Sequence, residues 1–162
     1  MSMEAKIVRV AHAETAIDGE VLAALGLGSC VAVLLHDPDR GVGGMAHVLL
    51  PGPRAAGDAG NPAKYAKTAV PHLIWLLEKA GAEPAELVAR LVGGASMFGP
   101  MLSPGRLNTG ERNLVAARRA LASLKLPVIA EDVGGEHGRS VYFYPESGRV
   151  MVKSFRYGEV EL

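Results

Sequence analysis

Short apolar runs separated by glycine, proline and aspartate dominate the pattern along the chain. Many of these runs contain β-branched residues and end at a turn-forming residue, which is typical of strands. They predict seven strands, over residues 5–10, 30–36, 43–50, 87–92, 128–133, 140–144 and 149–154. Residues 31–35 are apolar at every position, so we expect a central strand here that is covered on both faces.

Two turn sequences connect neighbouring strands. Residues 37–41 read Asp-Pro-Asp-Arg-Gly and residues 145–148 read Pro-Glu-Ser-Gly. Proline and glycine at such places favour tight turns, so strands 30–36 and 43–50 are expected to form a hairpin, as are 140–144 and 149–154. Residues 51–61 are rich in proline, glycine and alanine and are the best loop candidate.

A spacing of three to four residues between apolar positions predicts a first helix that begins at Asn61 and Pro62 and runs to Gly81. Asparagine suits the N-cap and proline suits the first helical position. Pro71 lies inside this pattern, so we expect it to kink the helix or to split it at Val70.

A second helix is predicted to start near Thr109 as its N-cap, with Glu111 placed favourably in the first turn. Its apolar stripe consists of Leu114, Ala117, Leu121 and Leu124. Seven strands and two helices predict an α/β sandwich in which the helices pack against a mixed sheet.

Length and composition predict one soluble domain over residues 1–162, with 49% hydrophobic and 21% charged residues. Lys plus Arg and Asp plus Glu number 17 each, and no long basic run marks a nucleic-acid surface. No secretory signal is visible, and no apolar run approaches the roughly 18 residues that span a bilayer. We therefore expect a cytoplasmic protein with no nucleic-acid partner and no direct membrane insertion.

Cys30 is the only cysteine, so it can form no disulfide within the chain and no zinc site on its own. We expect neither a metal nor a cofactor. A buried small hydrophobe and a reactive thiol both remain open for Cys30, and burial is the commoner state of a free cysteine.

The segment Leu-Gly-Leu-Gly-Ser-Cys ends at Cys30, and glycines at 26 and 28 allow a sharp bend before the thiol. Such a bend can leave backbone N–H groups around Gly28 and Ser29 aimed at one point, as an oxyanion needs during acyl transfer. The Gly-x-Gly spacing is no dinucleotide fingerprint, because no third glycine follows and the next element is a strand.

His47 lies on the strand predicted to pair with the strand of Cys30. In an antiparallel hairpin the start of one strand lies near the end of its partner, so the two side chains are expected to be neighbours. A histidine there can take the proton of the thiol and deliver it to a leaving amine. A hydrogen-bonded core histidine is an equally good interpretation from the residues alone.

The strings LGLGSCVAV at 25–33 and GGMAHVLLP at 43–51 strongly resemble CheD, the chemoreceptor glutamine deamidase family. Matching strings cover most of residues 7–153 in the expected order, and they are KYA at 64–66, GGASM at 93–97, NTGERN at 108–113 and AEDVGG at 130–135. The resemblance implies hydrolysis of glutamine side-chain amides on chemoreceptors, with Cys30 and His47 as the catalytic pair. It also implies an α/β/β layered sandwich similar to the cytotoxic necrotizing factor-like cysteine hydrolases, and a CheC-type phosphatase as a partner.

One position departs from the family pattern. Members usually carry threonine directly before the LGLGSC segment as part of a catalytic triad, and here that residue is Ala24. His47 must then be oriented by a backbone carbonyl or by another hydroxyl, for which Ser29, Ser96 and Thr109 are candidates. We expect a slower enzyme; the alternative is a weakly active or inactive binding protein that docks on a CheC-type phosphatase or on receptors.

Apolar residues near the middle of the chain give one further expectation. Ser96, Met97 and Phe98 are candidates for a loop that contacts a helical substrate or partner. The glycine pairs at 93–94 and 134–135 are expected to form tight turns, since neither precedes the Lys-Ser/Thr of a phosphate-binding loop.

Overall fold

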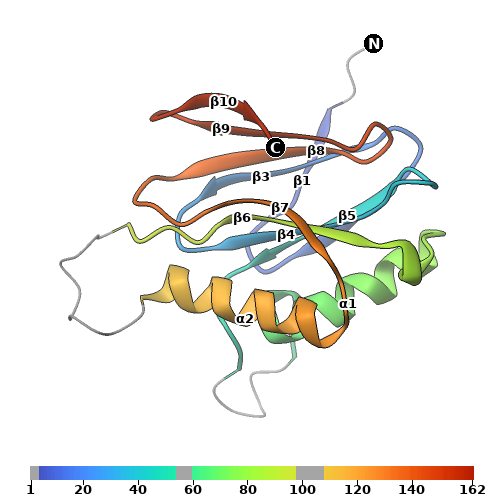
Figure 1. Cartoon of the computed structure of the whole chain (residues 1–162), viewed down its shortest axis with the longest axis horizontal. Coiled ribbons are helices and arrows are strands. Elements are labelled where there is room, and N and C mark those ends of the chain that lie inside the picture. The colour runs from blue at the N-terminus through green and yellow to red at the C-terminus, as the bar shows by residue number, and fades with distance from the viewer. Residues whose placement is uncertain (1–3, 54–59, 98–107) are drawn as a thin grey trace.

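The computed structural model describes residues 4–53, 60–97 and 108–162. In this part of the chain, ten strands and two α-helices form three layers (Figure 1). In chain order the elements are β1 (Ala5–Ile7), β2 (Ala13–Ala16), β3 (Val21–Leu27), β4 (Val31–Asp37), β5 (Val42–Val48), the 3₁₀ turn η2 (Pro62–Lys64), α1 (Ala66–Lys79), η3 (Pro84–Glu86), β6 (Val88–Gly93), α2 (Thr109–Ser123), β7 (Val128–Val133), β8 (Arg139–Tyr144), β9 (Arg149–Ser154) and β10 (Gly158–Glu161).

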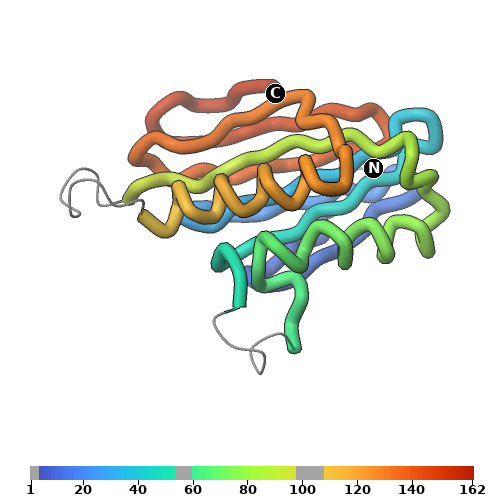
Figure 2. The backbone as a smooth tube through the Cα atoms, turned by 60° about the horizontal axis from the view of Figure 1, so that its bottom comes forward, coloured from blue at the N-terminus to red at the C-terminus, as the bar shows by residue number. Residues whose placement is uncertain are grey.

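The strands form two mixed sheets of five strands each. The outer sheet has the order β1-β3-β8-β9-β10 and the central sheet the order β2-β5-β4-β6-β7. Each sheet contains one parallel pair, β1 with β3 and β6 with β7. Both helices lie side by side on one face of the central sheet (Figure 2), and the outer sheet covers its other face. The predicted α/β/β layering is therefore confirmed.

Two hydrophobic clusters hold the layers together, and β4 contributes to both. Val31, Val33 and Leu35 pack with the helices. Ala32 and Leu34 point the other way and pack with the outer sheet. Every residue of β4 is buried, which confirms the predicted central strand.

The predicted hairpins are present. Strand β4 pairs antiparallel with β5, Val31 opposite Val48, and β8 pairs with β9. The first turn closes with a hydrogen bond from Gly41 N–H to the Asp37 carbonyl at 3.0 Å. Gly41 has φ +63°, in the left-handed region that favours glycine.

Three of the strands, β2, β3 and β10, were not predicted from the sequence. The pattern of apolar residues also predicted one mixed sheet, whereas the structure has two. Strand β3 is rich in alanine, leucine and glycine, β2 is four residues long, and all of β10 is exposed. None of these has the β-branched apolar alternation that marks a strand. Strand β1 is also shorter than the predicted 5–10 and ends at Ile7.

The first helix starts later than predicted, and the predicted split at Pro71 is absent. Pro62–Lys64 forms a separate 3₁₀ turn, Tyr65 is extended, and α1 begins at Ala66. Asn61 makes no capping bond; its side-chain amide donates to the Ala11 carbonyl instead. Pro71 does not split α1, which continues to Lys79. Its buried face packs on the central sheet, which offsets the missing backbone hydrogen bond.

Helix α2 is capped one residue earlier than predicted. Asn108 is the N-cap, its side-chain oxygen accepts from the Glu111 N–H at 3.0 Å, and Thr109 is the first helical residue. The predicted core stripe is confirmed at Leu114, Ala117 and Leu121. It fails at Leu124, which caps the C-terminus and is exposed. Among the described helices, none combines the length and apolar character needed to cross a membrane.

Candidate active site

Cys30 lies at the N-terminal end of β4, directly after the Gly28-Ser29 bend that follows β3. The chain enters this bend through an irregularity in the pairing of β3 with β8 between Ala24 and Leu27. Cys30 is partly exposed and packs against the cluster between the two sheets. The thiol therefore stands at the edge of the interlayer core, where a β-strand begins.

The backbone around Cys30 is closely packed against the end of β6. The Gly94 N–H donates to the Cys30 carbonyl at 2.8 Å, and the Ala95 N–H donates to the Gly28 carbonyl at 2.9 Å. Gly93 has φ +107°, and a Cβ atom built on it would lie 2.4 Å from the Cys30 oxygen. Only glycine fits there. The Gly93-Gly94 pair does not form the predicted tight turn; Gly93 ends β6, and the chain beyond it continues along the bend before the thiol.

His47 lies in β5 opposite Ala32 and is 3% exposed. Successive side chains of a strand alternate between faces, so His47 shares the interlayer face with Ala32 and Met45. Cys30, two residues before Ala32, packs on the same face. Diagonal neighbours of this kind have Cα atoms roughly 7 Å apart, with their Cβ atoms somewhat closer. The register therefore places Cys30 and His47 as diagonal neighbours on one face of the hairpin, and no hydrogen bond joins the thiol to the imidazole within the described residues.

The imidazole of His47 is held by the backbone of Val8. Nδ1 lies 2.9 Å from the Val8 carbonyl oxygen, which can only accept. Nδ1 therefore carries the proton, and Nε2 is left as the basic nitrogen. Val8 itself is fixed, since its N–H donates to the Ala23 carbonyl at 2.7 Å. The segment that follows β1 thus connects β3 to the histidine.

Burial sets the protonation states of both groups. It lowers the pKa of His47, and the hydrogen bond to the Val8 carbonyl opposes this only in part. It also raises the pKa of the Cys30 thiol, with the N–H of the same residue acting in the opposite direction. Near neutral pH the resting site therefore contains a thiol and a neutral imidazole, so a proton must be transferred before sulfur can act as a nucleophile.

Asn113 of α2 joins the two strands of the site from the helix side. Its side-chain NH₂ donates to the Ser29 carbonyl at 2.9 Å and to the Leu49 carbonyl at 3.0 Å. Asn113 is fully buried, and its Oδ1 accepts no hydrogen bond from the described residues. The sequence shows Asn113 only as part of a matching string, because its role depends on partners 84 and 64 residues away.

The bend also presents donors from which no oxygen in the described part of the chain accepts, although the Cys30 N–H interacts with the sulfur of its own side chain. Among the described residues, no oxygen accepts from the backbone N–H of Ser29 or Cys30. The carbonyl of Gly28 is occupied by Ala95, so the bend is held in place while these N–H groups remain available. Such an arrangement suits the stabilisation of a developing oxyanion beside the sulfur.

The remaining sequence candidates are placed as follows. Ala24 is fully buried on the interlayer face of β3 and has no hydroxyl to offer. The hydroxyls of Ser29, Ser96 and Thr109 make no bond to His47 within the described part of the chain; the Ser96 hydroxyl instead contacts Asn108 and Glu111 at the start of α2. The orienting group is the backbone carbonyl.

Two of the three loop candidates can be placed. Ser96 is anchored by donating its N–H to the Gly135 carbonyl at 2.8 Å. Met97 is half-exposed, and its side chain packs on Gly28, where a built Cβ would lie 3.2 Å from Met97 Cγ. Phe98 lies outside the described residues. Across residues 4–53, 60–97 and 108–162, no three His, Cys, Asp or Glu residues gather in a way that could hold a metal.

Comparison with known proteins identifies the family. The profile described as CheD chemotactic sensory transduction matches residues 49–154. A relative from Caldanaerobacter subterraneus named "Probable chemoreceptor glutamine deamidase CheD" is 40% identical over 158 residues, covering 96% of this chain and 98% of its own. The chain belongs to the CheD family. The profile match begins just after His47, but the relative's coverage extends over both Cys30 and His47.

Other CheD relatives are similarly close. "Probable chemoreceptor glutamine deamidase CheD 2" of Geobacter metallireducens is 44% identical over 154 residues, covering 93% of this chain and 95% of its own. "Chemoreceptor glutamine deamidase CheD" of Halalkalibacterium halodurans is 42% identical over 139 residues and covers 85% of each chain. Among solved structures, YlmD of Geobacillus stearothermophilus aligns with a TM-score of 0.46 and 17% identity, over 75% of this chain and 50% of its own.

Proposed function

We propose that this CheD protein is a protein-glutamine deamidase that acts on chemoreceptors, with Cys30 as nucleophile and His47 as its base. The names of its relatives support the reaction. The observation that carries the residue assignment is the Val8 carbonyl, which fixes the proton of His47 on Nδ1 and leaves Nε2 basic on the face shared with Cys30.

The reaction proceeds by acyl transfer. His47 Nε2 takes the proton of the Cys30 thiol, and the sulfur attacks the side-chain carbonyl carbon of glutamine. The bend at Gly28 and Ser29 supports the oxyanion through the backbone N–H groups of Ser29 and Cys30. The protonated imidazole then gives its proton to the departing ammonia, leaving a thioester.

Water completes the cycle. His47 Nε2 takes a proton from water, the resulting hydroxide adds to the thioester, and the C–S bond breaks. The thiolate recovers a proton, and the products are glutamate and ammonia.

The test is the mass of a purified receptor cytoplasmic fragment after incubation with the protein. The wild type should produce the mass change of amide-to-acid exchange at specific glutamines and release an equal amount of ammonia. Cys30→Ala should abolish both, and His47→Ala should slow them by about 10²–10⁴-fold. Deamidation by Cys30→Ala at the wild-type rate would refute the assignment.

A second function is favoured by one observation. Ala24 provides no hydroxyl where the family usually has threonine, and the thiol pKa is raised instead of lowered. On this alternative, the protein is a weakly active or inactive member that docks on a CheC-type phosphatase or on receptors. Ala24→Thr distinguishes the two: an increase in an existing deamidation rate supports the enzyme, whereas receptor or phosphatase binding without deamidation by either variant supports the binding protein.

A partner and a location follow from the same proposal. Chemoreceptor cytoplasmic regions would be the substrate, and the protein would act in the cytoplasm. Half-exposed Met97, packed on Gly28 beside the nucleophile, is suited to contact that substrate.

A further inference from the structure

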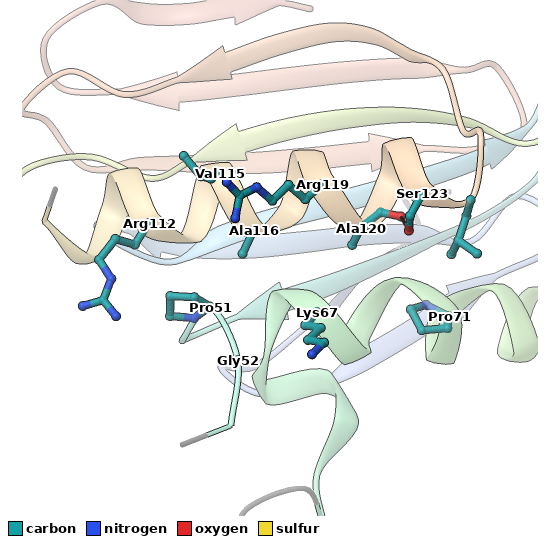
Figure 3. Close-up of a pocket in the computed structure, with 11 residues that line it drawn as sticks. Pro51, Gly52, Lys67, Pro71, Arg112, Val115, Ala116, Arg119, Ala120 and Ser123 are labelled. Atoms are coloured by element: carbon teal, nitrogen blue, oxygen red, sulfur yellow. Dashed lines mark hydrogen bonds between the residues drawn. The ribbon is translucent and has the colours of Figure 1, made fainter. Parts of the chain in front are cut away.

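A groove runs between α1 and α2 on the side of the helices that faces away from the sheets (Figure 3). Its volume is about 810 Å³. The lining comes from both helices and from the Pro51-Gly52 turn, and it includes neither Cys30 nor His47. The groove is therefore separate from the candidate active site, on the opposite side of the central sheet.

The floor of the groove is apolar. Ala116 and Ala120 lie on the side of α2 that faces α1, and Pro71 of α1 lies across from them (Figure 3). Val115 and Leu124 extend this surface, and Leu124 is 45% exposed. Ala116 and Ala120 are partly buried against the core between the helices and the central sheet, so the floor of the groove is the outer edge of that apolar core.

Among the described residues, three cations line the groove and no acidic side chain does. Lys67 comes from α1, and Arg112 and Arg119 come from α2. Within the described residues none of the three forms a salt bridge, whereas the neighbouring Arg118 pairs with Glu131 at 2.8 Å. The chain as a whole has no net charge, so this is a local excess of positive charge around an apolar floor.

We propose that this groove binds an acidic amphipathic helix of a protein partner, with short aliphatic side chains on the floor and Glu or Asp side chains beside the three cations. The lining comes from helices and a turn and contains no strand, so an added β-strand would find no backbone edge. A third helix can pack against the existing pair. From Arg112 to Leu124 the groove follows about 18 Å of α2, which matches roughly three turns of a bound helix.

The binding test uses a fluorescein-labelled helical peptide of alanine, leucine and glutamate, with leucines on one face and glutamates on both flanks. Fluorescence anisotropy with the full chain should give saturable binding that weakens as salt is added. The same peptide with lysine in place of glutamate should not bind. Amide chemical shifts in nuclear magnetic resonance spectra should change along α1 and α2 and not in the outer sheet.

Matched variants locate the contact. Arg119→Glu and Arg118→Glu change the net charge equally at adjacent positions, but only Arg119 lines the groove. Arg119→Glu should weaken binding about tenfold and Arg118→Glu by less than about twofold. Ala120→Trp should fill the floor and abolish binding, with circular dichroism checking that the fold is kept.

Four outcomes would overturn the proposal. They are an absence of saturable binding, shift changes away from the two helices, equal effects of the two charge reversals, and displacement of the peptide by a single-stranded oligonucleotide. The last would assign the cations to phosphates. Because binding is measured without deamidation, either proposal can fail while the other stands.

Discussion

Asn113 is predicted to hold the Cys30 bend in place, and replacing it tests this directly. Its two hydrogen bonds link the fully buried Asn113 side chain of α2 to the partly buried carbonyls of Ser29 and Leu49. Each bond contributes about 1 kcal/mol net, and a buried carbonyl left unpaired costs about 1–3 kcal/mol. Removing Oδ1, which is buried without a partner among the described atoms, recovers about 1 kcal/mol. The two carbonyls together cost about 2–6 kcal/mol, so Asn113→Ala should lower the free energy of unfolding by about 1–5 kcal/mol.

A second substitution separates the donor from the volume of the side chain. Asn113→Asp keeps the shape but turns an acceptor toward two carbonyl oxygens. Its carboxylate would be buried beside these oxygens, so it should destabilise more than alanine near neutral pH. Protonation of the new carboxyl would remove part of this destabilisation. The difference in unfolding free energy between Asn113→Asp and the wild type should therefore become smaller as the pH falls.

The assay is urea unfolding followed by far-ultraviolet circular dichroism, together with the deamidation rate under native conditions. Displacement of the bend should lower that rate by about 10–100-fold. Ser123→Ala, an exposed position in the last turn of α2, is the control and should change stability by less than about 0.5 kcal/mol. An Asn113→Ala protein with wild-type stability and rate would refute the reasoning.

Two more predictions concern the surroundings of the site. Gly93→Ala should lower the free energy of unfolding by about 2 kcal/mol or more, because its Cβ would clash with a carbonyl 2.4 Å away at φ +107°. Gly134→Ala, also at positive φ but in open space, should lose only about 1 kcal/mol in the same urea experiment, and equal losses would contradict the clash. Burial lowers the pKa of His36 and His47 from 6.5, so the unfolded chain binds these protons more readily. The free energy of unfolding should be highest above pH 6.5 and should fall as the pH drops below 6.5. His36→Gln should make this pH dependence weaker. Equal unfolding free energies above and below pH 6.5 would contradict the lowered pKa values.

Local signals were sufficient for the central hairpin but not for the outer sheet. The all-apolar run of β4 and the Asp-Pro-Asp-Arg-Gly turn act within a few residues, so they could be recognised in the sequence. Strand β3 instead owes its conformation to pairing with β8, more than 110 residues away, as the bond from Gly26 N–H to the Ser140 hydroxyl illustrates. The division into two sheets depends on such distant pairings. The resemblance to a family implied this division, but the spacing of apolar residues along the chain did not.

The candidate site divides in the same way. The neighbourhood of Cys30 and His47 follows from hairpin register, which can be read from the turn between their strands. The groups that hold Cys30 and His47 in place cannot be inferred from the sequence in this way. Val8 acts through a backbone carbonyl, which every residue type has, so the sequence contains no signal for it. Asn113 is visible only as an asparagine on a predicted helix, and its buried bonds depend on the packing of α2 against the central sheet.

The central claim is that the Cys30 sulfur forms a thioester with the glutamine side chain. Hydroxylamine competes with water for a thioester, so deamidation of a receptor fragment in its presence tests the claim most directly. The wild type should yield hydroxamate at the same glutamines that otherwise become glutamate, and Cys30→Ala should yield neither. Glutamate as the sole product at every hydroxylamine concentration, or hydroxamate formed equally well by Cys30→Ala, would contradict the account.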